Sequence, residues 1–259
     1  MRGIGPALLA ATLLCAGAQG DELREILYLP FDGDAKAVTA RGAAEPYQSR
    51  VDAWEEGVVG KAARSEKRYN GIRFDGRGNI DLNRGTLALF YKPLRDPGVG
   101  AWDPLFGVGS DLEGYWAGVL QFINKQDMNK RTMTAVHLFD IGRYSPMVSI
   151  EPIANRWKKD QWHHIAIVWD RFEGVKVYED GRLAADHWGR FRWDWSPSPR
   201  TLVFGEMFYS TRPFSVDEVH VYGACLTDAP VGFSPRASCA TCARRKAHGR
   251  AGGHRLRGR

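Results

Sequence analysis

The stretch Trp162–Leu183, with the sequence WHHIAIVWDRFEGVKVYEDGRL, indicates the fold class most directly. Its first apolar run has a period of two residues, which places Ile165, Ile167 and Trp169 on one face of an extended strand and the residues between them on the other. A second run follows after a short polar loop, and Asp180–Gly181 comes directly after it. Because Gly tolerates positive φ, Asp-Gly between such runs predicts a type I′ hairpin. The stretch therefore predicts a meander of antiparallel strands.

The rest of the chain continues this pattern of short strands. Gly, Pro, Asn and Asp separate roughly a dozen apolar or alternating runs, and no run has the period and length of a long helix. This pattern predicts an all-β protein whose two antiparallel sheets pack as a jelly-roll sandwich. Residues 35–68 show little periodicity, and we expect a long surface excursion in which Val58–Val59 touches the sheet. The predicted strands are Ile26–Phe31, Ile72–Phe74, Ile80–Leu82, Thr86–Tyr91, Pro104–Val108, Gly118–Ile123, Met133–Phe139, Met147–Ile150, Trp162–Trp169, Val175–Tyr178, Thr201–Gly205 and Val216–Tyr222.

Residues 1–20 have the pattern of a secretory signal peptide. Arg2 supplies the positive charge, Ala7–Cys15 the apolar run, and Ala18–Gly20 a small-residue cleavage site. The apolar run is too short to span a bilayer, and no other stretch is long enough, so no transmembrane segment is expected. We therefore expect an exported protein, extracellular or periplasmic, with one folded domain over residues 21–235.

The net charge of +6 is concentrated at the C-terminal end of the chain. Residues 236–259 carry eight Arg and Lys side chains and no acid, whereas residues 21–235 carry a formal charge of −3. A mildly acidic body argues against nucleic acid as a partner. The composition of residues 236–259 predicts a basic, disordered tail. Its Cys239-x-x-Cys242 spacing, with His248 and His254 behind it, is similar to half a zinc site but has no apolar sequence around it to fold.

Several short motifs follow one another in a fixed order along residues 26–230. They are Leu29–Gly33, Gly71–Gly76, Thr86–Pro93, Gln161–Ala166, Val177–Arg182, Leu202–Gly205 and Val216–Tyr222, followed by Leu226–Thr227. Their order and spacing resemble the laminin-G-like jelly roll of the concanavalin A-like lectin/glucanase superfamily. The resemblance implies two curved sheets, often with a sugar-binding concave face or rim, and places Trp162 and Tyr178 in the core. It does not select a ligand, because the fold also carries adhesion, hydrolytic and structural domains.

One departure from the family pattern is a Trp-rich insertion at residues 187–195. Flat rings beside hydrogen-bonding groups suit the apolar faces and hydroxyl edges of sugars. The alternative is that the insertion plugs one end of the sandwich with a small core of its own, since large aromatic side chains are mostly buried. The candidate carbohydrate-binding residues are Trp188, Phe191, Trp193 and Trp195, with Trp116 and Tyr209 on the same rim.

The resemblance also suggests a structural Ca²⁺ that joins the early strand to the last one. Asp32, Asp34 and Asp217 occupy the matching positions. Ca²⁺ takes 6–8 oxygen ligands, many from backbone carbonyls, so carboxylates from two distant segments would supply part of the set. The alternative is that Asp32 caps a turn and Asp217 pairs with a nearby Arg.

A catalytic role requires two carboxyl groups that flank a glycosidic bond. The family's glucanases carry a Glu-x-Asp-x-x-Glu pattern on a central strand, and no predicted strand here has it. Asp217 and Glu218 are adjacent and should point to opposite faces. We therefore expect a non-catalytic module that binds a polysaccharide or surface glycan. The alternatives are a structural or adhesion module with a protein partner, or a glycoside hydrolase or polysaccharide lyase of the same fold.

Overall fold

The computed structural model describes residues 25–67, 71–95, 103–109, 118–126, 132–138, 147–150, 157–188, 201–205 and 213–226. These residues form sixteen β-strands and no α-helix. The described part of the chain therefore contains no membrane-spanning helix. The strands are β1 (Glu25–Leu29), β2 (Thr39–Ala40), β3 (Gln48–Ser49), β4 (Ala53–Glu56), β5 (Lys61–Ser65), β6 (Gly71–Asp75), β7 (Arg84–Pro93), β8 (Asp103–Gly109), β9 (Gly118–Gln126), β10 (Thr132–Leu138), β11 (Met147–Ile150), β12 (His163–Asp170), β13 (Gly174–Glu179), β14 (Arg182–Trp188), β15 (Thr201–Gly205) and β16 (Phe214–Tyr222).

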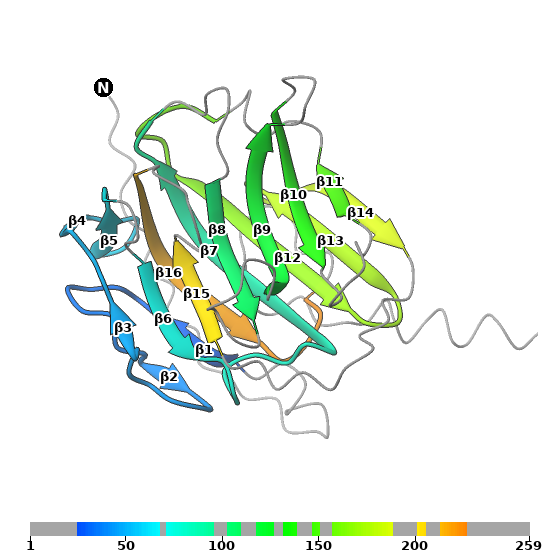
Figure 1. Ribbon diagram of the computed structural model, residues 1–259, viewed down its shortest axis with the longest axis horizontal. Helices are drawn as coiled ribbons and strands as arrows, with labels where there is room; N and C mark the ends of the chain where they lie inside the picture. Colours follow the sequence, from blue (N-terminus) through cyan, green and yellow to red (C-terminus); the bar gives the residue numbers. More distant parts are fainter. Residues whose placement is uncertain are drawn as a thin grey trace, which may run out of the picture.

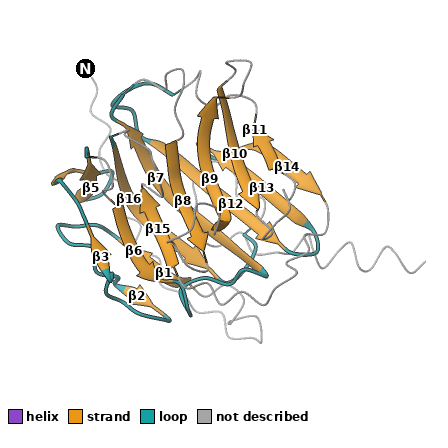
Figure 2. Cartoon of the chain, in the orientation of Figure 1, coloured by secondary structure: helices purple, strands orange, loops and turns teal. Residues whose placement is uncertain are grey.

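The strands form two antiparallel sheets that lie one behind the other (Figure 1). Sheet A has nine strands, in the order β14-β13-β12-β7-β16-β1-β2, with β5 beside β16 and β4 beside β5. Sheet B has seven strands, in the order β11-β10-β9-β8-β15-β6-β3. Strands and connecting loops make up the whole described part of the chain (Figure 2). The predicted all-β jelly-roll sandwich is confirmed.

The core lies between the two sheets, and its buried residues on strands come from β1, β5, β6, β7, β8, β12, β13, β15 and β16 among the described side chains. Ile165, Ile167 and Trp169 of β12 are at most 2% exposed and belong to it, which confirms the predicted inward face. Sheet B contributes Phe106 and Phe204, which are fully buried. Burying such side chains is the main favourable term in the folding of a sandwich, at roughly 25 cal/mol per Å² of apolar surface.

The turn between β13 and β14 has the predicted type I′ geometry. Asp180 has a φ of 49° and Gly181 a φ of 76°, which are the two positive values that this turn requires. Glu179 and Arg182 pair directly on either side of the turn. This geometry matches the right-handed twist of the two strands, and it confirms the meander.

The structure corrects the prediction for residues 35–68. This segment holds four short strands, β2 to β5. Val58 and Val59 form the tip of the β4–β5 hairpin, and their side chains are 41% and 54% exposed. Their backbone amides do contact sheet A, as expected, because they donate hydrogen bonds to Asp217 of β16. The buried residues of β5 are Ala62, Ala63 and Ser65. Small side chains of this kind give only a weak hydrophobic period, and the sequence therefore hides the strands.

The structure also corrects the expected core positions of Trp162 and Tyr178. Both are only partly buried, and neither belongs to the core cluster. Tyr178 pairs with Ala166, which lies between the inward-facing Ile165 and Ile167. Alternation therefore places Tyr178 on the face of sheet A that points away from sheet B.

Gly85 allows the close contact between β7 and the indole of Trp169, and Gly85→Ala should destabilise the fold. A Cβ at this position would lie 2.5 Å from Cζ2 of Trp169, and overpacking of this kind typically costs about 1–3 kcal/mol. Gly223→Ala is the matched control, because its Cβ would meet its nearest atom at an ordinary 3.7 Å. Urea denaturation measures both variants. Equal unfolding midpoints for the two would contradict this packing.

Candidate functional site

The face of sheet A that points away from the core, which we call the outer face, carries a row of side chains across five adjacent strands. The row follows from four successive cross-strand pairs. The row consists of Tyr28, His220, Ala88, Ala166 and Tyr178. Ala88 and Ala166 are buried, at 1% and 5% exposure, and larger rings stand on both sides of this pair.

Aromatic and imidazole rings gather along this row. The rings of Tyr28 and His220 stack with centroids 4.5 Å apart and an interplanar angle of 7°. Tyr222 stacks on the same imidazole at 6.2 Å. In the neighbouring row, the rings of Phe90 and His164 lie 5.0 Å apart. All of these rings except that of Tyr222 are partly exposed, so the outer face presents flat ring surfaces.

The outer face continues past Phe90 to Trp162. The Nζ atom of Lys92 lies 4.7 Å from the centroid of the Trp162 ring. The same ammonium group forms an ion pair with Glu55 at 2.7 Å, and the hydroxyl of Ser215 donates a hydrogen bond to that carboxylate. These contacts hold the ammonium against one face of a partly exposed indole.

Two carboxylates control the charge of His220. Its Nδ1 lies 2.6 Å from Oε1 of Glu25, and its Nε2 lies 3.6 Å from Oε2 of Glu218. Burial lowers the pKa of His220, but hydrogen bonds and charge attraction from Glu218 and Glu25 outweigh it and raise the pKa to about 9. The ring is therefore an imidazolium at neutral pH.

The neighbouring tyrosines are held in their neutral form. Burial, together with the charge of Glu218, raises the pKa of Tyr28, and burial together with Glu25 raises the pKa of Tyr222. The hydroxyl of Tyr28 donates a hydrogen bond to Glu218 at 3.1 Å. The outer face thus combines ring surfaces with fixed donors and acceptors, which suits a flat ligand rich in hydroxyl groups.

Asp217, one of the predicted Ca²⁺ ligands, is fully buried and accepts three backbone hydrogen bonds. Its Oδ2 accepts from the amides of Val58 and Val59 at 2.7 and 3.1 Å, and its Oδ1 accepts from Glu218 at 2.9 Å. Burial raises the pKa of Asp217 to about 6, although the amides of Val59 and Val58 lower it. The carboxylate therefore ties β16 to the tip of the β4–β5 hairpin.

Asp32 lies against the same hairpin, because its Oδ1 accepts from the amide of Lys61 at 2.8 Å. The structure thus brings Asp32 and Asp217 to one turn, as a shared ion would require. Asp34 is exposed and accepts from the amide of Lys36 at 2.8 Å in a local turn. A carboxylate has about four acceptor positions, so these hydrogen bonds do not use the whole acceptor capacity of Asp32 or Asp217. The Ca²⁺ site stays a prediction.

The predicted carbohydrate-binding residues lie mainly outside the described residues. This holds for Phe191, Trp193 and Trp195, and for Trp116 and Tyr209. The backbone of Trp188 is described; it ends β14 and pairs with Gly174 at the edge of sheet A. The Trp-rich insertion therefore begins at the sheet that carries the outer face.

Sequence reasoning missed the rings of the outer face itself. These rings are those of Tyr28, Phe90, His164 and His220, at positions between core residues where the side chain points away from the core. The alternation of core and outward positions is visible in the sequence of each strand. The row across the strands is not visible there, because it depends on how strands far apart in the chain align.

The raised pKa of His220 predicts that the protein loses stability as the pH rises above neutrality. The ring titrates near 6.5 when unfolded and near 9 when folded, so its contribution is complete below the first value and lost as pH passes the second. We expect a loss of about 1–3 kcal/mol, since one pKa unit corresponds to about 1.4 kcal/mol. Chemical denaturation near pH 6.5 and near pH 9 measures how the free energy of unfolding changes with pH.

His220→Gln should lower stability near pH 6.5 and flatten the slope. His164→Gln is the control, because burial lowers the pKa of that ring, and a lowered pKa changes stability with pH in the opposite direction to His220. A slope that persists in His220→Gln would show that other groups cause it.

Asp217→Asn should loosen the β4–β5 hairpin. The amide group cannot replace a carboxylate that accepts from three backbone N–H groups, and a buried unmatched donor costs about 1–3 kcal/mol. Hydrogen exchange should speed up at Val58 and Val59, and the free energy of unfolding should fall. Asp34→Asn removes a charge from an exposed local turn and should change neither quantity. Equal effects of the two variants would contradict this role for Asp217.

Comparison with known proteins agrees with this architecture. Residues 66–232 match the family described as the concanavalin A-like lectin/glucanases superfamily, and no curated protein matches the chain. Domain 4 of the extracellular arabinanase AbnA from Geobacillus stearothermophilus, solved with arabinotriose, is similar in fold, with a TM-score of 0.55, 22% identity and coverage of 78% of this chain and 95% of that domain. The ligand-binding domain of botulinum neurotoxin serotype D, solved with N-acetylneuraminic acid, has a TM-score of 0.57, 12% identity and coverage of 80% of this chain and 49% of that one. The family match covers more than half of the sequence, and the chain belongs to the concanavalin A-like lectin/glucanase superfamily.

Proposed function

We propose that this protein is an exported, non-catalytic module that binds a glycan on the outer face of sheet A. The observation that carries the proposal is the set of partly exposed rings beside an imidazolium and two carboxylates. Membership of the superfamily supports a binding role, and the pattern of residues 1–20 supports export.

A sugar matches this surface in both of its chemical parts. The C–H faces of a pyranose or furanose ring pack on aromatic rings, and its hydroxyl groups need donors and acceptors at the ring edges. Tyr178 supplies a ring beside the small Ala166, and Glu25 and Glu218 supply acceptors near His220. Stacking and ion pairs already order Tyr28 and His220, so binding would cost little side-chain entropy there.

The carboxylates of the outer face support binding rather than hydrolysis. Glycoside hydrolysis needs one protonated acid and one free base or nucleophile on the two sides of the scissile bond. Glu25 and Glu218 instead share the imidazolium of His220, and Glu218 also accepts from Tyr28. Both carboxylates are therefore engaged with one cation, and this arrangement does not place a free acid opposite a free base.

The solved structures of similar fold support a carbohydrate and leave its class open. One was solved with arabinotriose, a neutral sugar, and another with N-acetylneuraminic acid, an acidic one. We therefore propose a polysaccharide or surface glycan as the partner and test both classes.

Glycan binding by the outer face should depend on Tyr178. We expect arabino-oligosaccharides or sialylated oligosaccharides to change the Trp fluorescence of the full chain, and Tyr178→Ala to weaken binding about 5- to 10-fold, since a stacked ring contributes roughly 1 kcal/mol. Phe172→Ala is the matched control, because Phe172 is 65% exposed on the turn between β12 and β13. Calorimetric titration gives the affinities.

Trp193→Ala tests the alternative location in the Trp-rich insertion. Loss of binding in Trp193→Ala with full binding in Tyr178→Ala would move the site to that insertion. The glycan proposal fails if neither class of oligosaccharide alters the fluorescence or the heat of mixing.

A further inference from the structure

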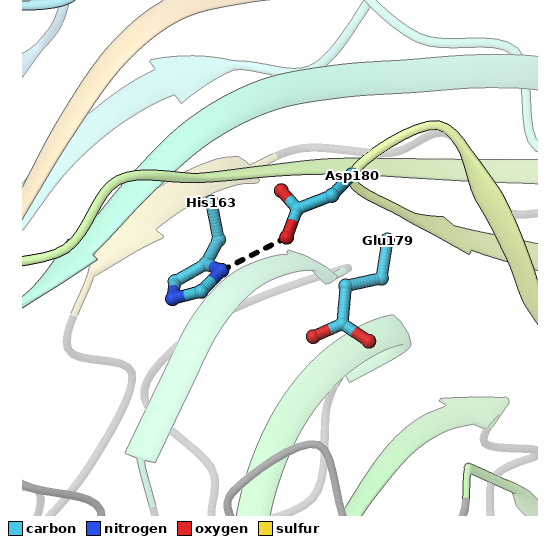
Figure 3. A group of neighbouring side chains, drawn as sticks. All are labelled: His163, Glu179 and Asp180. Atoms are coloured by element: carbon cyan, nitrogen blue, oxygen red, sulfur yellow. Dashed lines mark hydrogen bonds and ion pairs between the residues drawn. The ribbon is translucent and has the colours of Figure 1, made fainter. Parts of the chain in front are cut away.

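A second group of titratable side chains lies at the end of the β12–β13 pair, away from the outer face. His163 is the first residue of β12, Glu179 is the last residue of β13, and Asp180 is in the turn that follows. One ligand atom from each residue lies within 4.8 Å of the other two. Figure 3 shows the imidazole and the two carboxylates converging on one space from the two strands and the turn.

The left-handed turn brings the two carboxylates together. Consecutive residues of a strand point to opposite faces, so Glu179 and Asp180 would diverge in a continuous strand. Asp180 instead has a φ of 49°, and its carboxylate lies on the side of His163. Its Oδ1 accepts from the amide of His164 at 2.8 Å, and its Oδ2 lies 3.1 Å from Nδ1 of His163.

The other two side chains are held by Trp157. The indole Nε1 donates a hydrogen bond to Oε1 of Glu179, and the indole ring stacks on the imidazole of His163 at 5.0 Å and 13°. His163 and Glu179 are each 9% exposed, whereas the side chain of Asp180 is 52% exposed. Two ligands are thus fixed in place, and the third faces solvent, where an ion could enter.

The charges of this group favour a divalent cation. Two carboxylates this close repel each other, more strongly where they are buried, unless a proton or cation lies between them. With a neutral imidazole, their combined charge balances that of a divalent ion. One nitrogen and two carboxylate oxygens form a set typical of Zn²⁺ and similar transition metals, whereas Ca²⁺ prefers oxygen ligands alone.

The second ring nitrogen of His163, Nε2, is buried and has no hydrogen-bond partner. This missing partner is expected both with and without a bound metal. Without a metal, Nδ1–H donates to Asp180 and the lone pair of Nε2 is unmatched. With a metal on Nδ1, the proton moves to Nε2 and is unmatched there. The same atom lacks a partner in either state.

We propose that His163, Glu179 and Asp180 form a binding site for a zinc-type divalent ion, with the fourth coordination position open to solvent beside Asp180. Ligand atoms of a tetrahedral zinc lie about 3.3 Å apart, given bonds of about 2.0–2.1 Å. Nδ1 of His163 and Oδ2 of Asp180 are 3.1 Å apart, which is close to this value. Small side-chain shifts would bring all three ligand atoms, which lie within 4.8 Å of one another, to this spacing. The bound ion would fasten the β13–β14 turn to the start of β12. The site is independent of the proposed glycan site.

Titration of the metal-stripped full chain with ZnCl₂ tests this site. We expect one strongly bound equivalent and a rise in the thermal unfolding midpoint, since an ion that binds only the folded state stabilises it. Asp180→Asn should weaken binding at least tenfold. Asn tolerates the left-handed conformation and its side-chain oxygen can still accept from His164, so the turn stays intact. His164→Gln, at the neighbouring position on the outer face, should bind as the wild type does.

The experiment needs a separate control for the tail cysteines, because Cys239 and Cys242 are also possible zinc ligands. The double substitution Cys239→Ser with Cys242→Ser should keep the strong equivalent, and Co²⁺ bound at that equivalent should lack a thiolate charge-transfer band. Loss of binding in the double variant, or full binding in Asp180→Asn, would overturn the proposal. None of these measurements uses a sugar, so they succeed or fail separately from the glycan test.

Discussion

The pairing of β7 with β12 on one side and with β16 on the other is the constraint on which the rest of the structure depends. Side chains alternate along a strand, so the register that buries Leu87 and Leu89 also places Ala88 and Phe90 on the outer face. A shift of one residue would expose the core and bury the rings. The hydrophobic core and the candidate glycan surface are therefore two consequences of one register.

A bulge in β16 interrupts this alternation between Asp217 and His220, beside the outer face. The register shifts between Asp217, which pairs with Phe90, and His220, which pairs with Ala88, and Glu218 has a φ of 48°. One extra residue in the strand lets Asp217 and His220 both face away from the core while Val219 stays buried. The carboxylate of Glu218 then reaches Tyr28 and His220. Bulges commonly redirect side chains in this way near functional sites.

The side chains of the adjacent residues His163 and His164 of β12 lie on opposite faces of sheet A, because strand residues alternate. His164 faces outward and contacts the ring of Phe90, whereas His163 is buried against Trp157 at the start of β12. Asp180 connects the two places, since it accepts from the amide of one and approaches the ring of the other.

The sequence by itself determined the fold class, the meander and its turn. These depend on local patterns: the alternation of Ile165, Ile167 and Trp169, and the positive φ that Gly181 permits. Tertiary structure alone decided the outer-face row and the group formed by His163, Glu179 and Asp180. Tyr28 and Glu218, for example, are 190 residues apart in the chain. Which distant residues meet is set by strand order, register and bulges, and these minimise the free energy of the whole sandwich rather than that of any one segment.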